Sequence, residues 1–167
     1  VVDIQDNDGL TSGVTQVVDL DSLDIVAMRV FSGFLYILTN NASFDQKIYK
    51  LEILNSEGAL GGLEFVFDWS SYSNNQFSAL CFTLDYQGNL YIGSDSELYP
   101  ITVVENGSAR TLYPSILSPP INYMSWGNSN YLYVINRMAD VKRVQRIKKV
   151  HSLCCTDCSR LSSFKSS

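Results

Sequence analysis

Short apolar segments recur along this chain, and each one is bounded by Gly, Asn, Ser or Asp residues. Alternation of apolar and polar positions over such short segments favours half-buried β-strands over helices. In Lys47–Leu54, for example, alternate positions place Tyr49, Leu51 and Ile53 on one face of the predicted strand. The pattern therefore predicts antiparallel strands joined by tight turns.

The predicted strands fall into three successive units, at about residues 21–70, 75–114 and 120–150. Residues 1–20 precede them as a polar, acidic loop and an edge strand at 14–20, and residues 151–167 follow as a basic tail that contains cysteines. The expected strands are 24–31, 34–39, 47–54 and 63–69 in the first unit, 77–84, 90–93, 97–104 and 109–113 in the second, and 121–126, 131–136 and 141–150 in the third.

The most regular turn of the chain spans Asp85–Ile92, with the sequence Asp-Tyr-Gln-Gly-Asn-Leu-Tyr-Ile. Its Asp side chain can accept hydrogen bonds from the turn, and Gly88 can supply a positive φ. Weaker copies occur at Ser32–Ile37 and Ser129–Val134. The Leu of the shared Leu-Tyr pair stands at positions 35, 90 and 132, so the spacings are 55 and 42 residues.

The Asp85–Ile92 segment resembles the Asp-x-x-Gly-Asn-Leu-Tyr-Val turn and strand of β-propellers of the NHL, YWTD and gluconolactonase-like kind. The resemblance covers about residues 21–150 and implies propeller blades rather than one particular family. Together with the repeat spacing, it predicts an all-β fold, a β-propeller or partial propeller of about three to four antiparallel blades. An open β-sandwich, or a stack of three or four sheets joined end to end, is the alternative.

Charge is unevenly distributed along the 167 residues. Residues 1–136 contain 15 acidic and 4 basic side chains, whereas residues 137–167 contain 2 acidic and 8 basic ones. Such a division can steer one surface onto an oppositely charged one. The acidic overall balance argues against a nucleic-acid partner, and no apolar run is long enough for a membrane span.

The third unit ends in a basic strand that we predict to be an interaction surface for a protein partner or for a second copy of the chain. A solvated outer strand is the alternative. A contact between this strand and the acidic body of another copy would be heterologous, and it would propagate head to tail into a ring or a filament. The predicted surface comprises Lys142, Arg143, Arg146, Lys148 and Lys149.

The C-terminal tail contains the sequence His-x-x-Cys-Cys-x-x-Cys, at residues 151–158. A zinc site usually draws its two ligand pairs from separate segments, so this cluster predicts disulfides rather than a metal site. The disulfide candidates are Cys154, Cys155 and Cys158. Cys81 lies within a predicted strand and is expected to be a buried, apolar residue.

Two Asn-x-Ser sequons, at Asn41 and Asn106, lie in predicted turns and are candidate glycosylation sites. The sequons and the tail cysteines predict an extracellular, secreted protein. The start at Val1 without a leader fits both a mature secreted protein and an excised segment. Solvent-side aromatic residues could stack on glycans; the candidates are Trp69, Tyr72, Tyr113 and Trp126.

Candidate catalytic groups are few. The three carboxylates that could form a lactonase-like calcium site, Glu64, Asp85 and Asp95, can each be explained by a turn or a surface position. We therefore predict no catalytic residue, no cofactor and no metal. The predicted function is a non-enzymatic structural or adhesive module for protein–protein assembly, including head-to-tail self-assembly into a larger or filamentous structure. A lectin-like, carbohydrate- or ligand-binding propeller and a metal-dependent lactonase-type hydrolase are the alternatives.

Overall fold

A computed structural model describes residues 3–5, 11–13, 23–41, 45–55, 59–112, 119–127, 131–138 and 141–148. The described chain is all-β apart from one four-residue helix. The predicted edge strand at 14–20 and the tail at 151–167 lie outside these residues. Within the predicted N-terminal loop, β1 (Asp3–Gln5) pairs with β2 (Thr11–Gly13), so an antiparallel hairpin replaces part of the expected loop.

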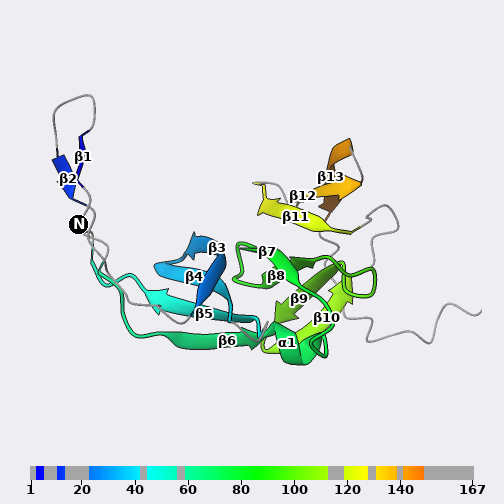
Figure 1. The fold of residues 1–167 in the computed structure, drawn as a ribbon, viewed down its shortest axis with the longest axis horizontal. Helices are drawn as coiled ribbons and strands as arrows, with labels where there is room; N and C mark the ends of the chain where they lie inside the picture. The colour runs from blue at the N-terminus through cyan, green and yellow to red at the C-terminus, as the bar shows by residue number, and fades with distance from the viewer. Residues whose placement is uncertain are drawn as a thin grey trace, which may run out of the picture.

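Three antiparallel sheets follow one another along the chain, and within each sheet every strand pairs with the next one in sequence (Figure 1). The first sheet contains β3 (Asp24–Phe31), β4 (Phe34–Asn40), β5 (Lys47–Glu52) and β6 (Glu64–Asp68). The central sheet contains β7 (Ala79–Leu84), β8 (Leu90–Ser94), β9 (Ile101–Glu105) and β10 (Ser108–Leu112). The third sheet contains β11 (Ile121–Trp126), β12 (Tyr131–Met138) and β13 (Val141–Lys148).

Tight turns join the paired strands where the sequence predicts them. Ser32 and Gly33 both have positive φ, as do Asn106 and Gly107, so each pair forms the mirror-image two-residue turn that matches strand twist. In the β7–β8 turn, the Asp85 carboxylate accepts hydrogen bonds from the backbone N–H groups of Gln87 and Asn89, at 2.9 and 3.0 Å. Gly88 has φ +84°, which confirms its predicted role in this turn.

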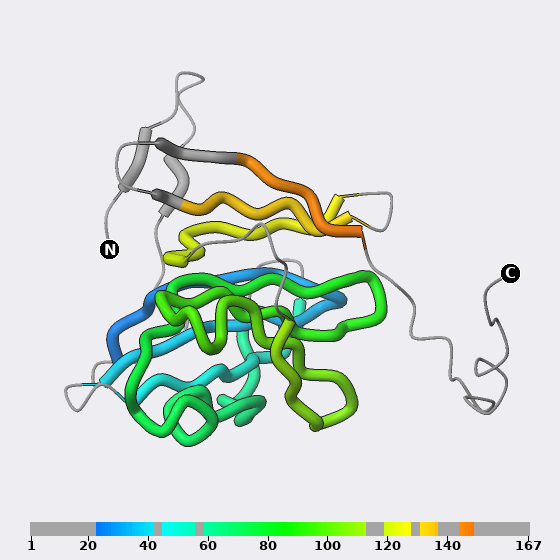
Figure 2. The backbone as a smooth tube through the Cα atoms, turned by 90° about the vertical axis from the view of Figure 1, so that its right-hand side faces the viewer, coloured from blue at the N-terminus to red at the C-terminus, as the bar shows by residue number. Residues whose placement is uncertain are grey.

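Two separate apolar cores hold the three sheets face to face. One core packs the first sheet against the central sheet and includes Leu38, Ile48, Phe82 and Ile92. The other packs the central sheet against the third sheet and includes Cys81, Tyr91, Ile101, Ile121, Met124, Leu132 and Val134. The first strand of the central sheet, β7, lies against both β3 and β11, and Figure 2 shows the third sheet lying along the strands of the central one.

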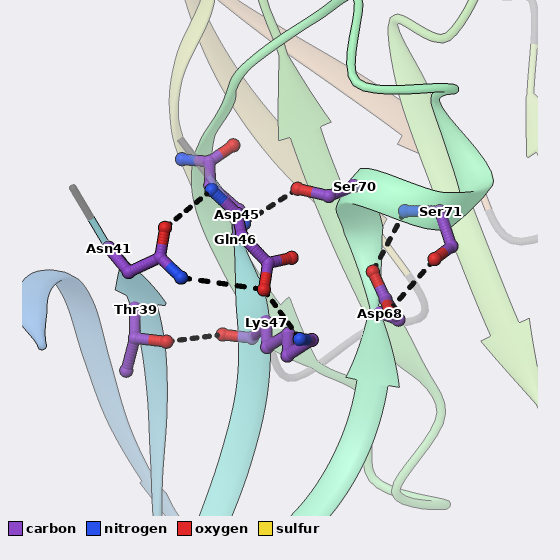
Figure 3. A network of polar contacts seen from close by, with 8 residues as sticks. All are labelled: Thr39, Asn41, Asp45, Gln46, Lys47, Asp68, Ser70 and Ser71. Atoms are coloured by element: carbon purple, nitrogen blue, oxygen red, sulfur yellow. Dashed lines mark hydrogen bonds and ion pairs between the residues drawn. The ribbon is translucent and has the colours of Figure 1, made fainter. Parts of the chain in front are cut away.

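The first sheet ends differently from the prediction. The expected strand 63–69 is β6, which stops at Asp68, because the next residues form helix α1 (Trp69–Tyr72). The Asp68 carboxylate caps this helix by accepting hydrogen bonds from the backbone N and Oγ of Ser71, at 2.8 and 2.9 Å (Figure 3). Trp69 is fully buried and donates from Nε1 to the carbonyl of Phe77, so it packs in the core between the first and central sheets.

A buried glutamine ties the first two sheets together. The Gln46 side chain accepts from the backbone N of Ala79 at 2.7 Å and donates to the carbonyl of the same residue at 3.0 Å. The backbone N of Gln46 also donates to Ser70 Oγ (Figure 3). Because β7 is an edge strand of the central sheet, Gln46 supplies hydrogen bonds to the Ala79 backbone that no neighbouring strand provides on that side. The same bonds fix the position of the central sheet relative to the first.

Candidate interaction surfaces

The strand registers show that the three sheets are copies of one packing unit. Leu35, Leu90 and Leu132 occupy the same position, opposite Val30, Leu84 and Trp126 respectively. The first strand of every sheet also has a register shift at the same place, between Ile25 and Ala27, between Ala79 and Cys81, and between Ile121 and Tyr123. The bulge and the Leu-Tyr pair therefore define equivalent residues throughout the repeat.

Equivalent residues point the same way in each unit. Leu90 and Ile92 face back to the first sheet, whereas Tyr91 between them faces forward to the third sheet. Leu132 and Val134 likewise face back to the central sheet. Each sheet thus has a rear face, which meets the preceding sheet, and a front face, which meets the following one. The first sheet has no described sheet at its rear, and the third has none at its front.

The rear face of the first sheet carries exposed apolar side chains along β3. Ile25, Met28 and Val30 are equivalent to Ala79, Phe82 and Leu84 of the central sheet, which are almost completely buried against the first sheet. Yet the three β3 side chains are 45%, 51% and 68% exposed, respectively. We call these three residues the first-sheet patch. Their positions are of the kind that forms a core in the next unit, but here they face solvent.

The front face of the third sheet shows the same contrast. Val144 on β13 is equivalent to Ile48 and Ile101, which are both fully buried, but Val144 is 70% exposed. Tyr133 is equivalent to the buried Tyr91 and is 38% exposed. Arg146 pairs with Tyr133, and Lys148 with Tyr131, in the β12–β13 register. We call Tyr133, Val144, Arg146 and Lys148 the third-sheet patch.

Two of the predicted basic residues, Arg146 and Lys148, can be placed together with their side chains. Arg146 and Lys148 are exposed on the same side of β13 as Val144, whereas Gln145 and Ile147 are partly buried on the side of the central sheet. The Arg146 guanidinium also lies over the Tyr131 ring, 5.1 Å from its centroid. The backbones of Lys142 and Arg143 belong to β13, and Lys149 lies outside the described residues.

The two outer sheets differ in charge. The described residues between 23 and 68 include five acidic and three basic side chains. The described residues of β11–β13 include five basic side chains and no acidic one. In the third-sheet patch, the exposed Val144 and Tyr133 lie beside the basic Arg146 and Lys148, a combination of apolar and charged side chains that suits a protein-docking surface.

The candidate catalytic carboxylates lie in three different local environments. Asp85 is fully buried within the β7–β8 turn, where it also accepts from the hydroxyl of Tyr91 at 3.3 Å. Asp95 accepts from the backbone N of Ser78 at 2.9 Å, and Glu64 forms an ion pair with Lys50 at 3.0 Å. In the described part of the chain, no group of three or more His, Cys, Asp or Glu side chains is placed to hold a metal ion.

Cys81 is the cysteine that the structure describes, and it is buried as predicted. Its thiol lies between the central and third sheets and donates to the carbonyl of Ile121 at 3.4 Å. Burial raises the pKa of this thiol to about 12, which makes it unreactive at neutral pH. The disulfide candidates Cys154, Cys155 and Cys158 lie outside the described residues.

The two sequons have different surroundings. Asn106 is exposed at the tip of the β9–β10 hairpin. The Asn41 side chain is half-buried, and its Oδ1 accepts from the backbone N of Asp45 at 3.0 Å while its Nδ2 faces the Asp45 carboxylate (Figure 3). A glycan would be attached at Nδ2, so Asn106 is the more accessible of the two candidate sites.

The aromatic residues considered for glycan stacking are mostly used in packing. Trp69 is fully buried, so its predicted solvent-side position was wrong; it packs on Tyr72 and Tyr99 instead. Trp126 is half-buried and makes an edge-to-face contact with Tyr91, with ring centroids 4.9 Å apart. Tyr113 lies outside the described residues.

Sequence reasoning identified the basic strand but missed the first-sheet patch and Val144. An alignment of the three units on the Leu-Tyr pair marks Met28, Phe82 and Met124 as equivalent apolar positions, but it does not show that Met28 alone is exposed. Single-unit patterns cannot reveal it, since alternation alone does not say whether a neighbouring sheet covers a given face.

In comparisons with known proteins, no family model, curated protein or solved structure matches this chain. Among the described residues, no helix is both long and apolar enough to cross a membrane.

Proposed function

We propose that this chain is a non-enzymatic structural or adhesive module that assembles with protein through its two outer sheet faces. The observation that carries the proposal is the repeat equivalence. Ile101 is buried where a neighbouring sheet covers it, whereas the equivalent Val144 is 70% exposed, and Ile25, Met28 and Val30 on β3 are exposed although their equivalents on β7 are buried. Covering such apolar surface is the main favourable term in protein association.

The sheet arrangement supports a propeller-like or partial-propeller architecture for this module. Each sheet is an antiparallel meander, and the first strands β3, β7 and β11 lie next to one another. At the inner edge, the Arg29 guanidinium of β3 reaches the ring of Tyr123 on β11, 5.2 Å from its centroid. Blades arranged around a common axis bring their first strands together in this way.

The local environments of the carboxylates favour assembly over hydrolysis. Asp85, Asp95 and Glu64 each have a structural partner of their own, in a turn, at the start of β7 and across the β5–β6 pair. Their arrangement gives no convergent set of oxygen ligands, which a calcium-dependent hydrolase would use to bind its ion.

We also propose an extracellular setting, in which Asn106 carries a glycan. The exposed hairpin tip of Asn106 supports this proposal, because a glycan attached there would extend into solvent. The basis is otherwise the sequence, through the two sequons and the tail cysteines.

Sedimentation velocity over a range of protein concentrations tests the assembly function. We expect the 167-residue chain to associate, and Val30→Glu or Val144→Glu to shift the population towards monomer. Leu98→Glu is the matched control, because Leu98 is 57% exposed but belongs to neither patch. If the Leu98 variant weakens association as much as the other two, or if none of the three does, the outer faces are not the assembly surfaces.

A further inference from the structure

The strand β13 is the last described strand of the third sheet, and it forms the outer edge of that sheet (Figure 2). The first and central sheets each have a fourth strand at this place, β6 and β10. We propose that β13 accepts an extended, acidic segment of a partner protein as the fourth strand of its sheet. This inference rests on the proposed function, since it names the kind of partner that the third sheet takes.

The backbone of β13 is suited to such pairing. Its eight residues pair one to one with β12, from Lys148 opposite Tyr131 to Val141 opposite Met138, without a register shift. A long and regular edge strand is a template for a further strand, and main-chain hydrogen bonds then give affinity for an extended peptide. The equivalent strands β5 and β9 use the same side to pair with β6 and β10.

The repeat also indicates which charge the added strand carries. Arg146 is equivalent to Lys50, because each lies opposite the Tyr of its Leu-Tyr pair. Lys50 Nζ lies 4.9 Å from the centroid of the Phe34 ring and forms an ion pair with Glu64 of β6 at 3.0 Å. Arg146 lies 5.1 Å from the centroid of the equivalent Tyr131 ring, but no carboxylate of the described residues pairs with it. An acidic residue opposite Arg146 completes the same three-part contact.

Lys148 predicts the same sign of charge. It is equivalent to Glu105, because each follows the residue opposite the Leu of the Leu-Tyr pair. Glu105 forms an ion pair with Arg110 of the fourth strand β10 at 3.3 Å. Arg110 and Glu64 occupy the same position of their strands, opposite the residues equivalent to Arg146. Since Lys148 reverses the charge of Glu105, this position beside β13 favours an acidic residue on both grounds.

An apolar residue is expected two positions further along the added strand. The existing fourth strands place Phe67 opposite Ile48 and Leu112 opposite Ile101. Val144 is the equivalent residue of β13 and is 70% exposed, so an apolar side chain opposite it covers surface that now faces solvent. The partner segment therefore has the pattern acidic-x-apolar in an extended conformation.

The chain that follows β13 has the wrong composition for this role. In the other two sheets, the fourth strand is the next strand along the chain. Residues 149–167 contain three Lys or Arg side chains and one acidic residue, Asp157, with the polar Ser159 two positions later. This tail does not supply the acidic-x-apolar pattern, and its charge opposes that of β13. We therefore assign the fourth strand to a separate protein.

Fluorescence anisotropy of a labelled peptide tests the inference on the full 167-residue chain. The probe Thr-Glu-Thr-Glu-Thr-Val-Thr places its two Glu residues opposite Lys148 and Arg146, and its Val opposite Val144, in antiparallel register. We expect the probe to bind, and the affinity to fall as the salt is raised from about 0.05 M to about 0.5 M, because screening reduces attraction between exposed charges. A control peptide with Lys in place of both Glu residues should not bind.

Two N-methylated forms of the probe separate strand pairing from attraction between charges. Alternate N–H groups of an extended peptide point to the same side. Methylation of one alternate set therefore blocks pairing with β13, whereas methylation of the other set does not. We expect one form to lose binding and the other to keep it. Equal affinity of the two forms would show that charge alone holds the peptide, and it would overturn the inference.

Variants locate the bound peptide. Arg146→Gln should weaken binding by up to about 5-fold, the range of one cross-strand charge pair. Arg110→Gln is the matched control, because it removes an equally exposed Arg charge from β10. Arg146→Glu combined with Lys148→Glu should abolish binding of the probe and allow binding of the Lys peptide, a reversal that misfolding cannot produce. If Arg110→Gln weakens binding as much as Arg146→Gln, β13 is not the binding strand.

The result is separable from a failure of the proposed function. A chain that self-associates in sedimentation velocity but does not bind the probe at any accessible concentration overturns the inference and leaves the assembly function intact. The edge of β13 is then closed, whether by the acidic residues 1–22 of the chain or by another contact. A chain that neither associates nor binds the probe overturns both.

Discussion

Replacement of Gly93 by Ala is a direct test of how the central and third sheets fit together. Gly93 lies in β8, in the position that Leu38 and Ile135 occupy in the other two sheets. A Cβ atom built on Gly93 would lie 2.7 Å from Cγ2 of Ile121 and 2.9 Å from Sγ of Cys81. Both neighbours are short side chains on buried strands, so relief of the overlap requires movement of a strand.

The expected cost follows from two opposing effects. Adding a methyl group to a packed core costs ~1–3 kcal/mol. Replacing Gly by Ala also lowers the conformational entropy of the unfolded chain, which raises the free energy of unfolding by ~0.4–1 kcal/mol where the backbone conformation suits Ala. The net loss should therefore be about 1–2 kcal/mol in the free energy of unfolding, which for a domain of this size lowers the Tm by about 2–8 °C.

Urea unfolding followed by tryptophan fluorescence measures this loss, with Gly62→Ala as the matched control. A Cβ atom on Gly62 meets nothing within 4 Å, so that variant should differ from the wild type by less than ~0.5 kcal/mol. Adding Cys81→Ala to Gly93→Ala removes one of the two overlaps. The double variant should thus be more stable than the sum of the two single changes predicts.

The result that would refute the reasoning is a Gly93→Ala protein as stable as Gly62→Ala. It would mean that the third sheet does not approach β8 as closely as the 2.7 Å overlap requires. The assignment of front and rear faces, on which the proposed assembly surfaces rest, would lose its structural basis at the same time.

Three further predictions concern single side chains. Asp85→Ala leaves two turn N–H groups without their acceptor and should lower the free energy of unfolding by ~1–3 kcal/mol, seen as a lower urea midpoint with an unchanged slope. Because burial raises the pKa of Cys81 from 9.0 to about 12, the unfolded chain loses the proton first; stability from this group is complete below pH 9 and is lost as the pH rises towards 12. Cys81→Ala should show a shallower alkaline loss in urea midpoint, and an identical loss would contradict the assignment. Asn106→Gln should remove the mass of one glycan from protein made in glycosylating cells, and an unchanged mass would show that the site is not used.

The sequence predicted the strands well because they depend on local patterns. Alternating apolar positions and Gly-containing turns specify β4 and β8 within one or two residues, and Asp85 with Gly88 specifies its own turn through short-range hydrogen bonds. The end of β6 was missed because helix α1 is only one turn long. Its cap by Asp68 is a local hydrogen bond with Ser71, whereas the burial of Trp69 depends on contacts with the central sheet.

The candidate surfaces could be predicted only in part. The charge of β13 is visible in the sequence, since it needs no knowledge of neighbours. The exposure of Met28 is not visible, because the equivalent Phe82 and Met124 have the same apolar character and are fully buried. Only the position of each sheet in the stack separates the exposed residue from the two buried ones.

The sequence by itself therefore determined the strands, their turns, the three-unit repeat and the division of charge, all of which arise from interactions between residues close together in the chain. The tertiary structure decided which face of each sheet is covered. It packed Ile48 and Ile101 into two cores and left Val144, at the same position of the repeat, in solvent. The physical reason is that the hydrophobic effect is non-directional. An apolar strand face therefore favours burial against any apolar surface, and the arrangement of the sheets decides which surface covers it.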